Sequence, residues 1–119
     1  MSEELRRAFF EDLARIEDEA LGDAREALSG PSVPDWVESE AAVTTLRAAL
    51  TSRDQVDAMA TFVKDMVHEA VHSVLVAIDG GSASAEVGRV QLVSENGVPL
   101  GDALHEMYVD YLLETGRMS

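Results

Sequence analysis

The chain has no cysteine, a single lysine, three prolines and few aromatic residues, and each shortage removes a class of structure. Without cysteine there can be no disulfide, thiolate metal site or cysteine nucleophile. An aromatic content of 5% supplies too few rings for a base-stacking platform. The first residues are charged and lack the apolar run of a signal peptide or membrane span, so we expect a cytoplasmic protein that does not bind membranes.

Basic side chains are also scarce, with 9 Lys and Arg against 23 Asp and Glu and a net charge of −14. Such a chain repels phosphate backbones and anionic lipids, so we expect no nucleic-acid partner, while a basic protein partner stays open. The same excess of carboxylates is typical of solvation in a salt-adapted host, and the preference for arginine fits a GC-rich prokaryotic genome. The sequence leaves both explanations of the acidity open.

A length of 119 residues, 46% of them hydrophobic, predicts a single domain over residues 1–119. Apolar residues recur at helical spacing in four segments, which predict helices over 3–28, about 35–50, about 53–78 and about 101–116. The second begins at a capping box of Asp35 and Glu38, and the third at the S-x-x-Q pattern of Ser52 and Gln55. The glycines after positions 79 and 115 predict helix ends.

In residues 88–100 the hydrophobic pattern changes from helical spacing to alternation, which predicts a β-hairpin. Polar and apolar residues alternate in RVQLV, Asn96-Gly97 suits a tight turn, and Val98-Pro99-Leu100 is predicted to return as a short edge strand. The predicted fold class is therefore α+β and predominantly helical, a small four-helix bundle with one β-hairpin between helices three and four.

The apolar stripes predict which side of each helix faces the core. For the helix over 3–28 the stripe includes Leu5 and Ile16. For the helix over 53–78 the inward residues are predicted to be Val56, Met59, Val63, Met66, Val67, Ala70, Val74, Ala77 and Ile78. His68 and His72 then fall nearly opposite, on the polar face.

The sequence HEAVH, residues 68–72, resembles the zincin metalloprotease signature. The resemblance implies that His68 and His72 bind zinc while Glu69 acts as general base on the metal-bound water. A third ligand is needed, and His105 is the first candidate. Glu86 and Glu106 are the others. Zincins carry a sheet upstream of the motif, whereas everything upstream here is predicted helical.

A second metal interpretation starts from Glu69-x-x-His72, the spacing used in helical di-metal sites, with Asp102-x-x-His105 as an imperfect second copy. Asp102 is also interpreted as the N-cap of the last helix. The structural alternative places all three histidines at the surface or at the rim of the core, in which case no cofactor is expected. Zinc is the alternative cofactor.

Val109 and Leu113 lie off the apolar stripe of the last helix and are candidate interaction residues for self-association, such as a dimer, or for a protein partner. The preferred function is therefore a non-catalytic, acidic interaction protein of the regulator or toxin-immunity kind. The alternatives are a zinc-dependent hydrolase and an acidic decoy that occupies a nucleic-acid-binding protein.

Overall fold

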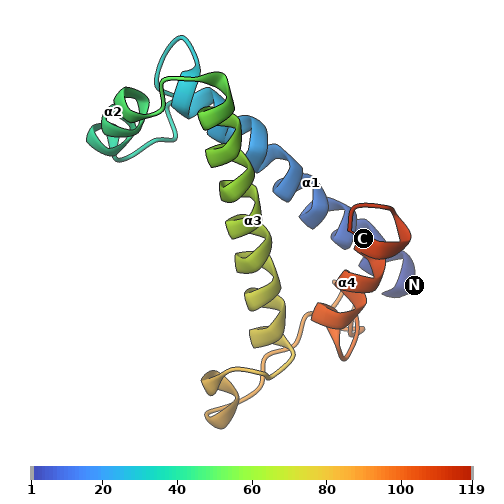
Figure 1. Cartoon of the computed structure of the whole chain (residues 1–119). Coiled ribbons are helices and arrows are strands. Elements are labelled where there is room, and N and C mark those ends of the chain that lie inside the picture. The colour runs from blue at the N-terminus through green and yellow to red at the C-terminus, as the bar shows by residue number, and fades with distance from the viewer. Residues whose placement is uncertain (1, 119) are drawn as a thin grey trace. The chain divides into compact units, whose positions relative to one another are not determined.

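The computed structural model describes residues 2–118, and 67% of the chain is helical, which confirms the predicted predominance of helices. The elements are α1 (Ser2–Ser29), α2 (Glu40–Ala49), α3 (Arg53–Ile78), a 3-10 turn η1 (Ala83–Glu86) and α4 (Leu104–Glu114), as Figure 1 shows. In the part of the chain described, no helix combines the length and apolar character needed to cross a membrane.

Several helix ends follow the local signals in the sequence. α3 begins at a reciprocal capping box, in which the Gln55 amide donates to Ser52 Oγ at 3.1 Å and the Ser52 amide donates to Gln55 Oε1 at 3.2 Å. Gly80 and Gly116 take φ values of 87° and 75° just beyond α3 and α4. This left-handed conformation suits glycine and ends a helix, so these predicted boundaries are confirmed.

The predicted start of the second helix is wrong. The Val37 amide donates to the Pro34 carbonyl at 3.1 Å and closes a turn over the residues that were predicted to form the capping box. α2 begins only at Glu40. Asp35 and Glu38 therefore lie in the connection that precedes α2.

The predicted β-hairpin is also wrong, and with it the α+β fold class. Residues 2–118 contain no strand, and the segment before α4 holds one isolated antiparallel bridge, between Val93 and Pro99. Pro99 has no amide proton to extend the ladder. Val90, Val93 and Val98 are 60%, 43% and 46% exposed, and only Leu92 and Leu100 of this segment join or contact the buried cluster, so the helices cover it incompletely. An isolated hairpin without such cover is marginally stable.

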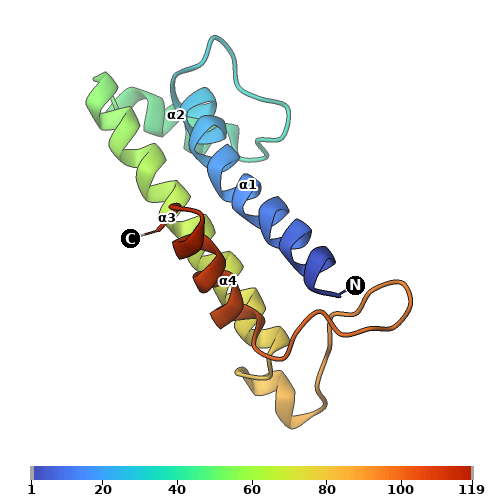
Figure 2. The same ribbon diagram turned by 90° about the vertical axis from the view of Figure 1, so that its right-hand side faces the viewer.

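The chain divides into two compact units. The first comprises Met1–Arg15 and Glu69–Ser119, and we call it the aromatic-core unit. Its buried cluster combines residues of the N-terminal part of α1, the C-terminal part of α3, and α4, helices that Figures 1 and 2 show from two sides. The cluster consists of Phe10, Ala14, Leu75, Leu100, Leu104, Tyr108, Tyr111 and Leu112. The Phe10 ring lies 5.2 Å from that of Tyr108 and 5.8 Å from that of Tyr111.

The second unit, Ile16–His68, we call the alanine-core unit. Its buried residues are mostly small, namely Ala24, Ala27, Leu28, Val56 and Ala60, together with Glu17. α2 buries no residue at all. The unit therefore has little apolar interior of its own relative to its length.

The predicted inward face of α3 is partly wrong. Met66 and Val74 are 56% and 59% exposed, whereas Ala60 and Leu75, which were not on the predicted stripe, are buried. The same correction applies to Leu5 and Ile16 on α1, which are 43% and 51% exposed. Apolar residues cover more than half of the circumference of α3, so the helical periodicity of the sequence did not determine which side of the helix is buried.

Candidate functional site

The first histidine of HEAVH does not lie on an open polar face. In the alanine-core unit, His68 Nδ1 lies 2.7 Å from Glu17 Oε1, which is a hydrogen-bond distance from the ring N–H to the carboxylate. The Glu17 side chain is 7% exposed and that of His68 29%. A buried carboxylate requires such a partner, and the imidazole supplies it. His68 therefore lies at the rim of the core and not on the open polar face that the apolar stripe predicted.

The second histidine has different surroundings. In the aromatic-core unit, the ring of His72 meets the ring of His105 edge to face, with centroids 5.6 Å apart and planes at 80°. Glu69, the predicted general base, is exposed. The rings of His72 and His105 thus meet without His68, whose Nδ1 atom is engaged by Glu17, although the zinc interpretation would have grouped all three histidines.

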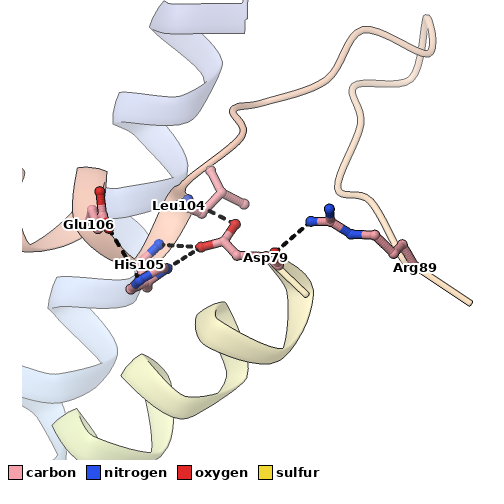
Figure 3. A network of polar contacts seen from close by, with 5 residues as sticks. All are labelled: Asp79, Arg89, Leu104, His105 and Glu106. Carbon is pink, nitrogen blue, oxygen red and sulfur yellow. Dashed lines mark hydrogen bonds and ion pairs between the residues drawn. The ribbon is translucent and has the colours of Figure 1, made fainter. Parts of the chain in front are cut away.

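A carboxylate at the end of α3 organises the start of α4 (Figure 3). Asp79 Oδ1 accepts from the Leu104 amide at 2.9 Å, and Oδ2 accepts from the His105 amide at 2.8 Å. Oδ2 also contacts His105 Nδ1. Asp79 therefore satisfies two first-turn amides of α4 from 25 residues away in the sequence. The N-cap position belongs to Ala103, so the interpretation of Asp102 as the cap is wrong.

The electrostatics of Asp79 follow from these contacts. Burial alone would raise the pKa of its carboxyl group, but hydrogen bonds from the His105 amide, the His105 ring and the Leu104 amide outweigh burial, and the pKa is held below its ordinary value. Arg89 Nη2 donates to the backbone carbonyl of Asp79 at 2.5 Å and closes the network on the other side (Figure 3). The arrangement links the end of α3 to the start of α4.

The remaining predicted ligands are dispersed. Glu86 in η1 and Asp102 are exposed, and Glu106 Oε1 lies 3.8 Å from His105 Nε2. Among the residues that the structure describes, no three or more His, Asp or Glu side chains are grouped so that they could hold a metal ion. The arrangement of the HEAVH residues is accounted for by the contacts with Glu17 and His105.

The predicted interaction residues on α4 differ in exposure. Val109 is half-buried, and Leu113 is 47% exposed. Neither lies in the buried cluster of the aromatic-core unit. Leu113 alone therefore offers a substantial apolar surface on that side of α4.

A larger apolar surface lies in the alanine-core unit and was not predicted as a site. An open groove of about 450 Å³ is lined by residues of α1, α2, α3 and the connection before α2. It is lined by Ala24, Ala27, Leu28, Trp36, Val37, Glu38, Ser39, Ala42, Val43, Leu46, Met59 and Val63. Trp36, the only tryptophan of the chain, is 58% exposed. Trp36, Val43 and Leu46 share one side of the helix that was predicted over about 35–50, and this apolar side was the sequence signal available for the groove.

The α2 wall of the groove is held by one arginine. Arg47 donates to four backbone carbonyls at or just after the C-terminal end of α1, those of Glu26, Ala27, Gly30 and Ser32, at 3.3, 2.8, 3.0 and 3.2 Å. These carbonyls include acceptors left without an intrahelical partner where α1 ends. Since α2 buries no side chain, Arg47 provides its principal polar attachment.

The surroundings of the groove are acidic. Of the four basic residues in Ile16–His68, Arg47 is occupied as described, Arg25 pairs with Asp57 at 3.0 Å, and Lys64 pairs with Asp18 at 3.3 Å. The same segment contains 11 Asp and Glu residues. The unit that contains the groove therefore carries a net negative charge.

Comparison of this chain with protein-family models, curated proteins and solved structures finds no match.

Proposed function

We propose that the chain is a non-catalytic binding protein that receives apolar side chains of a partner polypeptide in the groove of the alanine-core unit. The single observation that carries the proposal is the open groove of about 450 Å³, with Trp36 more than half exposed at its edge. Contiguous apolar surface left in water is costly to keep and marks interaction sites in folded proteins.

The composition of the groove suits protein recognition. Tryptophan contributes disproportionately to binding energy when a partner removes it from water. Leu46, Met59 and Val63 add aliphatic and thioether surface that adapts to the shape of an inserted side chain. Glu38 and Ser39 at the edge supply polar groups that can orient a partner.

The α2 wall supports the same proposal. A helix with no buried residue gains little from packing within its own chain. Its apolar side chains at Val43 and Leu46 are half-buried and face the groove. A partner seated in the groove would complete their burial, and each fully buried aliphatic side chain stabilises the complex by about 1.5–3 kcal/mol.

A neutral solvatochromic dye, Nile red, tests whether the groove receives apolar groups. We expect blue-shifted dye emission that saturates with the wild-type chain and is lost in Val43→Asp, which places a charge on the groove wall. Val87→Asp is the matched control, since Val87 is 95% exposed and lies outside the groove. Ala42→Phe, which fills the groove without adding charge, should also reduce binding. Far-ultraviolet circular dichroism checks that each variant retains its helices. Equal dye binding by wild-type and Val43→Asp would contradict the proposal.

A further inference from the structure

The apolar floor of the groove continues along α3. Met59 and Val63 line the groove, and Phe62 and Met66, which are 59% and 56% exposed, lie within one turn of them on the same helix. Met59, Phe62 and Met66 have the i, i+3, i+7 spacing of one helix face. At 1.5 Å per residue this face is about 10 Å long. The apolar surface of the alanine-core unit is therefore elongated.

Glu38 lines the groove, and further carboxylates are close in sequence to the residues that form this surface. Asp35, Glu38 and Glu40 follow one another along the connection into α2, and all three are exposed. None of them forms an ion pair among the residues described. Asp65, also exposed, lies between Phe62 and Met66 in the sequence of α3. The unit carries 11 acidic against four basic residues, and three of the four basic residues already have partners within it.

The known modes of peptide recognition limit the conformation that a partner segment can adopt in this groove. An extended peptide adds to an exposed sheet edge, and residues 2–118 provide no strand to receive one. An amphipathic helix instead lays an apolar stripe into a groove and places charged side chains at its margins. An elongated apolar floor with acidic margins is the complement of such a helix when its polar face is basic.

We propose that the partner segment is a cationic amphipathic helix, whose apolar stripe covers Trp36, Met59 and Phe62 and whose lysines or arginines meet the carboxylates at positions 35, 38, 40 and 65. This inference rests on the proposed function and specifies its partner. A second copy of this chain fits less well, because two chains of net charge −14 repel each other.

An 18-residue amphipathic helix of leucine and lysine is the probe, and its binding is followed through Trp36 fluorescence and calorimetry. A scrambled peptide of the same composition and a leucine–glutamate counterpart are compared with it. We expect saturable binding of the amphipathic lysine peptide, an increase in its helicity, and affinity that falls with salt. The scrambled and glutamate peptides should bind at least about tenfold more weakly.

Matched charge variants separate recognition from general attraction. The triple variant Asp35→Asn, Glu38→Gln, Glu40→Gln should bind the lysine peptide with about tenfold lower affinity, since three exposed ion pairs are lost. The control, Asp102→Asn, Glu86→Gln, Glu95→Gln, removes the same charges from exposed positions of the aromatic-core unit and should leave affinity nearly unchanged. Phe62→Ala should lower the affinity for the lysine peptide while leaving the binding of Nile red to the groove unchanged.

The outcomes distinguish the two proposals. Equal affinity for lysine and glutamate peptides, or equal losses in the two triple variants, would overturn the cationic partner while the dye result still stands for the groove. Peptide binding that Val43→Asp does not alter, together with unchanged dye binding, would overturn both.

Discussion

The two units use their large side chains in opposite ways. The aromatic-core unit buries Phe10, Tyr108 and Tyr111 to 2%, 0% and 8% exposure. The alanine-core unit leaves its largest rings, Trp36 and Phe62, 58% and 59% exposed and closes its interior with alanines. Burial of aromatic surface stabilises a fold, whereas the same surface in water is available to a partner. The difference indicates that stability is concentrated in the aromatic-core unit, whereas the alanine-core unit leaves the apolar surface on which the proposed recognition depends.

Of the substitutions that test this division between the units, Tyr108→Ala should have the largest effect on stability. Tyr108 is fully buried against Phe10, so its truncation should lower the free energy of unfolding by about 3–5 kcal/mol. Trp36→Ala, although it removes a larger ring, should change it by less than about 0.5 kcal/mol because Trp36 is mostly exposed. Urea denaturation measures both. Tyr108→Phe separates the ring from the hydroxyl group, and similar losses for Tyr108→Ala and Trp36→Ala would refute the division of roles.

His68→Ala should have an intermediate effect and tests the buried polar contact of the alanine-core unit. The substitution leaves the Glu17 carboxylate buried without its imidazole partner, and we expect a loss of about 1–3 kcal/mol. The double variant Glu17→Leu, His68→Leu removes both polar groups and should recover much of the loss. Glu69→Ala, an exposed neighbour, is the control and should be neutral. A neutral His68→Ala would show that the contact contributes nothing.

Asp79→Asn should have the smallest effect at neutral pH and a clear pH signature. The pKa of Asp79 is depressed in the folded chain, so its contribution to stability is present above the ordinary aspartate pKa of about 3.9 and is lost as the pH falls through the lower folded value. We expect Asp79→Asn to cost about 1 kcal/mol near pH 7, typical of a lost helix cap. The gap between wild type and variant should close on acidification. Thermal melts from pH 7 to pH 3 measure it, with Asp102→Asn as the exposed control, and a constant gap would contradict the assignment.

Part of the fold was predictable because it depends on near neighbours in the sequence. The extent of α3, its capping box at Ser52 and Gln55, and the ends at Gly80 and Gly116 were all predicted, since capping and left-handed glycine act over a few residues. The candidate site was predicted less well. The zinc interpretation grouped His68, His72 and His105, whereas in the structure His105 meets His72 and His68 pairs with Glu17. The apolar groove was not recognised, because its walls come from helices far apart in the sequence.

By itself the sequence determined that four helices form and where α1 and α3 run, through apolar periodicity and local capping. Only the tertiary structure decided which side of each helix is buried. Apolar residues surround more than half of α3, so several orientations satisfy its periodicity equally well. The orientation adopted buries Ala60 and Leu75 and gives His68 the Glu17 carboxylate, while Met66 stays in water. This orientation depends on contacts between residues that are distant in the sequence. In the same way α4 is capped by Asp79 and not by Asp102, because a hydrogen bond depends on proximity in space.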